Sequence, residues 1–130
     1  MNMERVNIQT DLAPKAVGTY GQGVCMGGIY FFSGQIGLNP ETMEMKDDFQ
    51  SQLDQIMANI DGLLKSQGLK RSDIFKTTIF LKDLGDFGGV NAAYEAYFEA
   101  PYPARSCVEV SAMPKGALVE IEVMAAKASN

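Results

Sequence analysis

Arg105, Cys107 and Glu120 are the residues whose types and spacing suggest chemistry in this 130-residue chain. They fall in two strand-like stretches, residues 104–110 and 118–126. The planar fork of an arginine binds a carboxylate through two parallel hydrogen bonds, and a nearby glutamate can take a proton from water. Such a pair would suit the addition of water to a small carboxylic acid. The alternative is a cross-strand ion pair between Arg105 and Glu120, and periodicity taken by itself favours that alternative.

The alternation along these two stretches predicts which residues share a face, because successive strand residues point to opposite sides. One set is rich in Val and Ile and should face the helices: Ser106, Val108, Val110, Val119, Ile121 and Val123. We therefore expect Arg105, Cys107 and Glu120 to lie together on the face that the helices leave uncovered. Leu118 and Met124 would make that face half apolar, which predicts burial against another subunit.

The rest of the chain predicts the elements that position these stretches. Further strands are expected at residues 5–8, 24–26, 29–33 and 74–82, with Gly27-Gly28 as a hairpin turn. An apolar stripe at steps of three and four predicts a helix over residues 47–66, ended by Gly68. A second helix is expected over residues 86–98. This order predicts a single α+β domain over residues 1–130, in which a mixed sheet is covered on one face by two helices.

Composition narrows the possible functions. The chain has no histidine, which excludes Ser-His-Asp and Cys-His catalytic arrangements and any zinc site with a histidine ligand. Its net charge of −5 argues against nucleic acid as a partner, since that affinity comes from Lys and Arg. No apolar run has the roughly 20 residues that cross a bilayer, and no leader peptide is visible. We therefore expect a cytoplasmic protein without a membrane partner.

Several stretches, in order along nearly the whole chain, resemble the RidA (YjgF) family. The most specific is the arginine segment at residues 103–110 (PARSCVEV). The SGQIGLNP motif at residues 33–40 and the stretches at residues 13–23, 76–84, 86–95 and 118–122 are also similar, and the matches are highly specific only together. The resemblance implies a fold related to trimeric chorismate mutase and a homotrimer with a β-barrel-like core. It also implies active sites between the subunits.

The resemblance further implies an activity without a metal or organic cofactor. The small-molecule substrates would be 2-iminobutanoate and 2-iminopropanoate, or their enamines, which are hydrolysed to 2-oxo acids and ammonia. By this similarity Arg105 clamps the substrate carboxylate and Glu120 activates water. The pocket-lining positions would be Tyr20, Ser33, Gly34, Asn91 and Cys107. With no histidine to activate it, Cys107 is expected to be a packed thiol rather than a nucleophile.

Two departures from the family pattern lie beside this expected cleft. Thr19 stands where many relatives have proline, and the segment between Phe98 and Pro103 is shorter than in many of them. Both predict a change in specificity, because Arg105 is retained. The leading alternative function is a non-catalytic sensor of 2-oxo acids that uses the same pocket. A ribonuclease or translation inhibitor fits the acidic charge poorly, and no particular residue supports a chaperone-like role.

Overall fold

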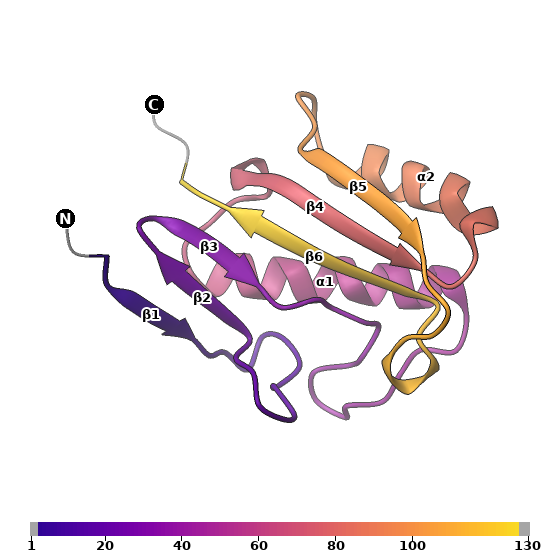
Figure 1. Cartoon of the computed structure of the whole chain (residues 1–130), viewed down its shortest axis with the longest axis horizontal. Helices are drawn as coiled ribbons and strands as arrows, with labels where there is room; N and C mark the ends of the chain where they lie inside the picture. The colour runs from indigo at the N-terminus through magenta and orange to yellow at the C-terminus, as the bar shows by residue number, and fades with distance from the viewer. Residues whose placement is uncertain (1–2, 128–130) are drawn as a thin grey trace.

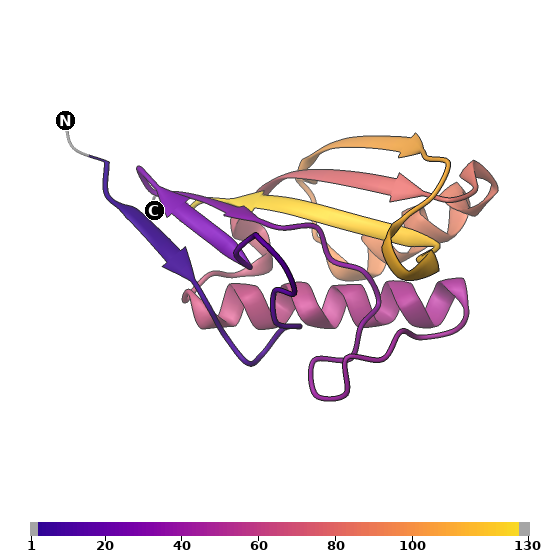
Figure 2. The ribbon, with the colours of Figure 1, turned by 60° about the horizontal axis from the view of Figure 1, so that its bottom comes forward.

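The computed structural model describes residues 3–127, which form a six-stranded mixed sheet with both helices on one face (Figures 1 and 2). The strands follow the order β1-β2-β3-β6-β4-β5 across the sheet. Their bounds are β1 Arg5–Ile8, β2 Gly23–Met26, β3 Ile29–Phe32, β4 Ile74–Leu81, β5 Ala104–Glu109 and β6 Val119–Ala125. The helices are α1 Phe49–Ser66 and α2 Phe87–Tyr97. The predicted fold class and the predicted order of elements are confirmed.

Local sequence signals fix the ends of α1 and the first hairpin. The carboxylate of Asp48 accepts a 2.8 Å hydrogen bond from the Ser51 backbone N–H and caps α1. The helix therefore begins two residues later than the predicted start at residue 47. Gly68 follows the end of α1 with a φ of 68°, which favours glycine. Gly27 and Gly28, with φ of 59° and 81°, turn β2 back onto β3 as the sequence predicts.

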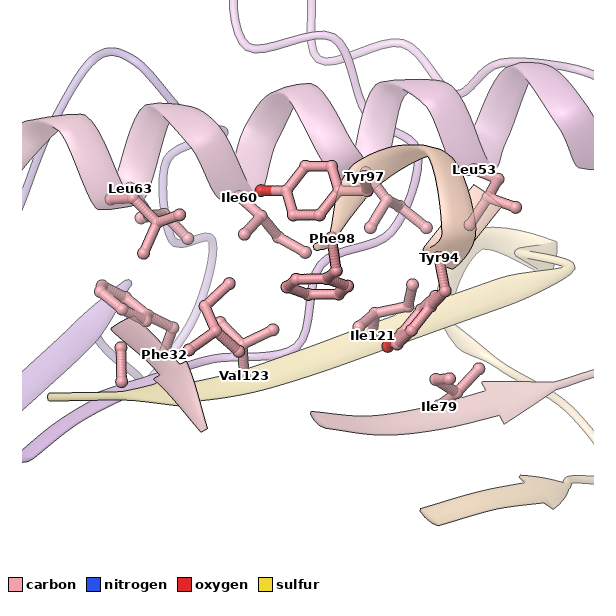
Figure 3. Close-up of a cluster of buried hydrophobic side chains, with 14 of the residues drawn as sticks. Phe32, Leu53, Ile60, Leu63, Ile79, Tyr94, Tyr97, Phe98, Ile121 and Val123 are labelled. Atoms are coloured by element: carbon pink, nitrogen blue, oxygen red, sulfur yellow. The ribbon is translucent and has the colours of Figure 1, made fainter. Parts of the chain in front are cut away.

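The hydrophobic core lies between α1, α2 and one face of the sheet (Figure 3). The stripe of α1 supplies fully buried side chains at Leu53, Ile56 and Leu63. Facing them are alternate residues of the central strands, namely Ile79, Leu81, Val119, Ile121 and Val123. This alternation confirms the face predicted for residues 118–126, and it sets the opposite face of β6, which carries Glu120, away from the helices.

The predicted placement of Arg105 and Cys107 beside Glu120 is wrong. Strand β4 lies between β5 and β6, so these strands are not neighbours and a cross-strand Arg105–Glu120 pair cannot form. Arg105 lies opposite the buried Thr77, and so lies on the helix side of the sheet. Glu120 lies opposite Phe80, on the uncovered side.

The error has a physical cause in the position of β5. As an edge strand, β5 meets the helix layer only at its margin, and Cys107 is its one half-buried residue. Val108, expected to be in the core, is 45% exposed on the uncovered face. Parallel pairing with β4 places Cys107 opposite the buried Ile79 and so decides which β5 residues face the helices. Because β5 is an edge strand, its alternation of apolar residues did not indicate which face this is.

An ion pair outside the sheet joins α1 to the segment that precedes β4. The Arg71 guanidinium donates to both carboxylate oxygens of Asp61, at 3.0 and 2.8 Å, and the Tyr97 hydroxyl donates to the same carboxylate at 2.6 Å. Burial opposes ionisation of Asp61, but the hydrogen bonds from Arg71 and Tyr97 outweigh it and hold the pKa of that carboxyl below its usual value.

We expect Asp61→Asn to lower the free energy of unfolding at neutral pH by about 1 kcal/mol or less, because the pair is partly exposed and screened. A lowered folded-state pKa gives stability that is present above the unfolded pKa and lost as pH falls through the folded pKa. The difference between wild type and variant should therefore shrink in acid. Urea unfolding of both proteins at pH 7 and at about pH 3 measures it; a difference independent of pH would contradict this account.

Candidate functional site

The predicted site residues divide between two cavities of one chain. The first cavity, of about 400 Å³, lies beside Arg105 at the edge of the sheet and also contacts Asn91 of α2. The second, of about 580 Å³, lies beside Glu120 and also contacts Tyr20, Ser33 and Gly34. Six of the seven predicted residues thus line a cavity, but the arginine and the glutamate lie in different ones.

The Arg105 side chain is held by α2. Its Nη1 donates a 2.7 Å hydrogen bond to the Asn91 side-chain oxygen. The guanidinium lies 5.1 Å from the centre of the Phe87 ring and 5.4 Å from that of Tyr94, within the range of cation–π attraction. One nitrogen is thus used to fix the fork in the cavity, and the remaining donors of the guanidinium can bind an anion.

Sequence reasoning did not assign Phe87 and Tyr94 a role beside Arg105. Tyr94 is buried, whereas Phe87 is 37% exposed. Figure 3 shows the Tyr94 side chain directed from α2 toward the sheet, and burial raises the pKa of its hydroxyl to about 12. Their spacing could have predicted this role, because Phe87 lies four residues before Asn91 and Tyr94 three residues after it, on the same side of a helix.

Cys107 packs against the hydrophobic core and lines neither cavity. Burial raises the pKa of its thiol, and the nearby Arg105 charge only partly opposes this. The thiol is therefore protonated near neutral pH, and a thiolate is the form that attacks electrophiles.

Glu120 is a half-buried carboxylate in the second cavity. Burial, and then repulsion from Glu122 on the same face, raise the pKa of Glu120. A raised pKa makes the carboxylate a better proton acceptor near neutral pH. Gly34 borders it closely, because a side chain at residue 34 would overlap the Glu120 carboxylate.

The other two predicted residues border the same cavity. The Ser33 hydroxyl donates a 2.6 Å hydrogen bond to the Gly21 carbonyl, and its backbone N–H donates to the Gln22 carbonyl at 2.9 Å. Tyr20 is 56% exposed, and its hydroxyl accepts a 3.4 Å hydrogen bond from the Val17 N–H. The loop that contains Tyr20 thus forms one wall of the Glu120 cavity.

We expect Gly34→Ala to lower kcat/KM for a substrate of this cavity by about 10- to 100-fold, the scale of a misplaced reacting group. The added methyl group would displace the Glu120 carboxylate. Gly88→Ala is the matched control, since nothing lies near a side chain at residue 88. Steady-state kinetics and thermal unfolding of both variants check this; equal activity in the two would show that Gly34 does not seat Glu120.

Residues 3–127 contain no group of three or more Cys, Asp or Glu side chains placed to hold a metal ion. Within the same residues, neither helix has the length and apolar character needed to span a membrane.

Most of the chain is similar to proteins of one family. Residues 10–127 match the family model described as endoribonuclease L-PSP. A 2-iminobutanoate/2-iminopropanoate deaminase of Escherichia coli is 48% identical over 123 residues, covering 92% of this chain and 96% of that protein. Protein DfrA of Myxococcus xanthus is 47% identical over 126 residues, covering 95% and 96% respectively.

Solved structures show the same similarity in three dimensions. RidA from an Antarctic Psychrobacter species superimposes with a TM-score of 0.91 at 43% identity, covering 94% of this chain and 99% of that one. Escherichia coli TdcF with bound serine superimposes with a TM-score of 0.89 at 40% identity, covering 95% and 99%.

Proposed function

Because this chain belongs to the RidA (YjgF) family, we propose that it hydrolyses reactive 2-imino acids and their enamines to 2-oxo acids and ammonia. The proposed substrates are 2-iminobutanoate and 2-iminopropanoate, after the related deaminase of Escherichia coli. The observation that carries the proposal is the fixed Arg105 fork, held by Asn91 at the edge of a cavity. Its free donors suit the carboxylate that every such substrate carries.

The proposed site is shared between subunits. Arg105 and Glu120 lie on opposite faces of one sheet, so one chain cannot present both to one small molecule. The uncovered face exposes Phe31 (46%) and Val108 (45%), which would be buried by another copy. We therefore assign the Arg105 cavity of one subunit and the Glu120 cavity of the next to one site, in a homotrimer.

The chemistry assigns one step to each group. Arg105 holds the substrate carboxylate and so orients the adjoining C=N bond. Glu120 takes a proton from water as the water oxygen bonds to the imine carbon and the C=N electron pair moves to nitrogen. Glu120 returns this proton to the nitrogen, which gives the neutral carbinolamine. The carbinolamine hydroxyl then passes its proton through Glu120 to the nitrogen, the C–N bond breaks, and ammonia leaves as the carbonyl forms. Positioning contributes much of the acceleration, since imines are already reactive toward water.

Subunit mixing tests the shared site. Arg105→Ala and Glu120→Gln should each be nearly inactive alone. Random mixed assemblies should recover activity at about one site in four, those with Arg105 from one variant and Glu120 from the other. Co-expression and a 2-iminobutanoate assay measure this, with each variant mixed with itself as the control. A mixture as inactive as its parents, although mixed assemblies form, would place both residues in one chain's site or outside the site.

Generating 2-iminobutanoate in situ with a threonine dehydratase, and trapping the surviving imine with semicarbazide, separates this proposal from its alternatives. Faster loss of imine with wild type supports deamination. Binding of 2-oxobutanoate without faster imine loss would instead support a sensor that uses the same pocket. The family description as an endoribonuclease would gain support only from RNA binding with a steep dependence on salt.

A further inference from the structure

Gln22 lines the second cavity, and its buried side chain also makes several hydrogen bonds to the backbone of residues 10–14. It is 4% exposed. Its side-chain oxygen accepts a 2.6 Å hydrogen bond from the Thr10 N–H. Its side-chain nitrogen donates to the carbonyl of Thr10 at 2.9 Å, of Ala13 at 3.2 Å and of Pro14 at 2.9 Å. One amide group thus satisfies four backbone groups of residues 10–14.

These contacts close the base of a loop. Residues 15–21 run from Pro14 to Gln22 and are mostly exposed, with Tyr20 near the end. Pro14 and Gln22 are both buried, and the Gln22 side chain joins them directly. Before the loop, Ala13 is in the core and the Leu12 carbonyl lies against α1, in space that a side chain at Gly62 would occupy. The loop is therefore exposed at its tip and fixed at its base.

The same base contacts the other wall of the cavity. The Gln22 carbonyl accepts from the Ser33 N–H at 2.9 Å, and the adjacent Gly21 carbonyl accepts from the Ser33 hydroxyl at 2.6 Å. Ser33 precedes Gly34, which borders Glu120. Gln22 thus directly follows the segment that contains Tyr20. Its side chain is hydrogen-bonded to residues 10–14, and its backbone carbonyl to Ser33 of the segment that seats Glu120.

We infer that Gln22 is a positioning residue for the deaminase site: its side chain closes the loop of residues 15–21 and so places Tyr20 relative to Ser33 and Glu120. The inference rests on the proposed function for its effect on turnover. Its effect on the loop does not depend on that function. Without the amide, Thr10 and Pro14 lose their partners and the loop can open at its base.

The test combines kinetics with hydrogen exchange on the full chain. Gln22→Ala should lower kcat/KM for 2-iminobutanoate by about 10- to 100-fold. It should also raise the rate of amide exchange in residues 15–21 by about 10-fold or more. The core strands β4 and β6 should stay protected and exchange much more slowly than this loop. Gln22→Glu keeps an oxygen acceptor for Thr10 but lacks the amide donors to Ala13 and Pro14, so it should loosen the loop similarly. It also provides a second variant if Gln22→Ala fails to fold.

Tyr97→Phe is the control for general destabilisation, because it removes the 2.6 Å hydrogen bond to Asp61, and neither of these residues lines the Glu120 cavity. It should leave kcat/KM within about 2-fold and loop exchange unchanged. If residues 15–21 of both Gln22 variants exchange at the wild-type rate, the inference is overturned. It is also overturned if the loss of activity in all three variants simply parallels their loss of thermal stability. If wild type does not hydrolyse the imine, the proposed function fails, and loop exchange still decides the role of Gln22.

Discussion

Arg105→Ala should lower kcat/KM for 2-iminobutanoate by about 10²- to 10³-fold, the value of two charge-assisted hydrogen bonds to the substrate carboxylate. The fold should persist, because the Arg105 side chain is exposed and its hydrogen bond to Asn91 is also at the surface. The semicarbazide-trapping assay measures the loss, and titration with 2-oxobutanoate should show weakened binding of this product.

Two further variants distinguish the planar donor geometry of the Arg105 guanidinium from its positive charge. Arg105→Lys keeps a positive charge but not the planar pair of donors, so it should recover only a small part of the activity. Arg5→Ala removes a charge from β1 at the opposite edge of the sheet and should leave kinetics unchanged. Full activity in Arg105→Lys would show that a positive charge is sufficient and that bidentate geometry is not required.

Glu120→Gln should lower kcat by about 10²- to 10⁴-fold, the range for loss of a general base. Binding of 2-oxobutanoate should change far less, because the carboxylate clamp is untouched. Wild-type kcat/KM should rise with pH through the raised pKa of Glu120 and then level off, since the ionised form is the base. A pH–rate profile of wild type and variant checks this, and the acidic limb should be missing from the variant.

Glu122→Gln is the matched control on the same face of β6. Repulsion from Glu122 contributes to the raised pKa of Glu120, so the variant should stay active and its acidic limb should move to lower pH. If Glu122→Gln loses activity as Glu120→Gln does, Glu120 is not the specific base. If Glu120→Gln keeps wild-type turnover, the proposed mechanism is wrong, and a site that works by positioning with Arg105 would remain.

The sequence alone was sufficient for the elements of this fold, because their signals are local. Asp48 caps α1, Gly68 follows its end, and the Gly27-Gly28 pair turns a hairpin, each through backbone preferences of a few adjacent residues. The arginine segment and the SGQIGLNP motif likewise placed the chain in its family, which the match over residues 10–127 confirms.

The sequence did not determine how distant strands and loops pair. Arg105 and Glu120 lie on opposite faces for two reasons. Strand β4 lies between β5 and β6, and the parallel register of β4 and β5 sets Cys107 opposite Ile79. Alternation assigns residues to two sets, but only pairing in the sheet decides which set faces the helices, and in an edge strand partial burial weakens that signal. The hold of Gln22 on residues 10–14 is also tertiary, since local spacing does not specify which backbone groups a buried amide meets.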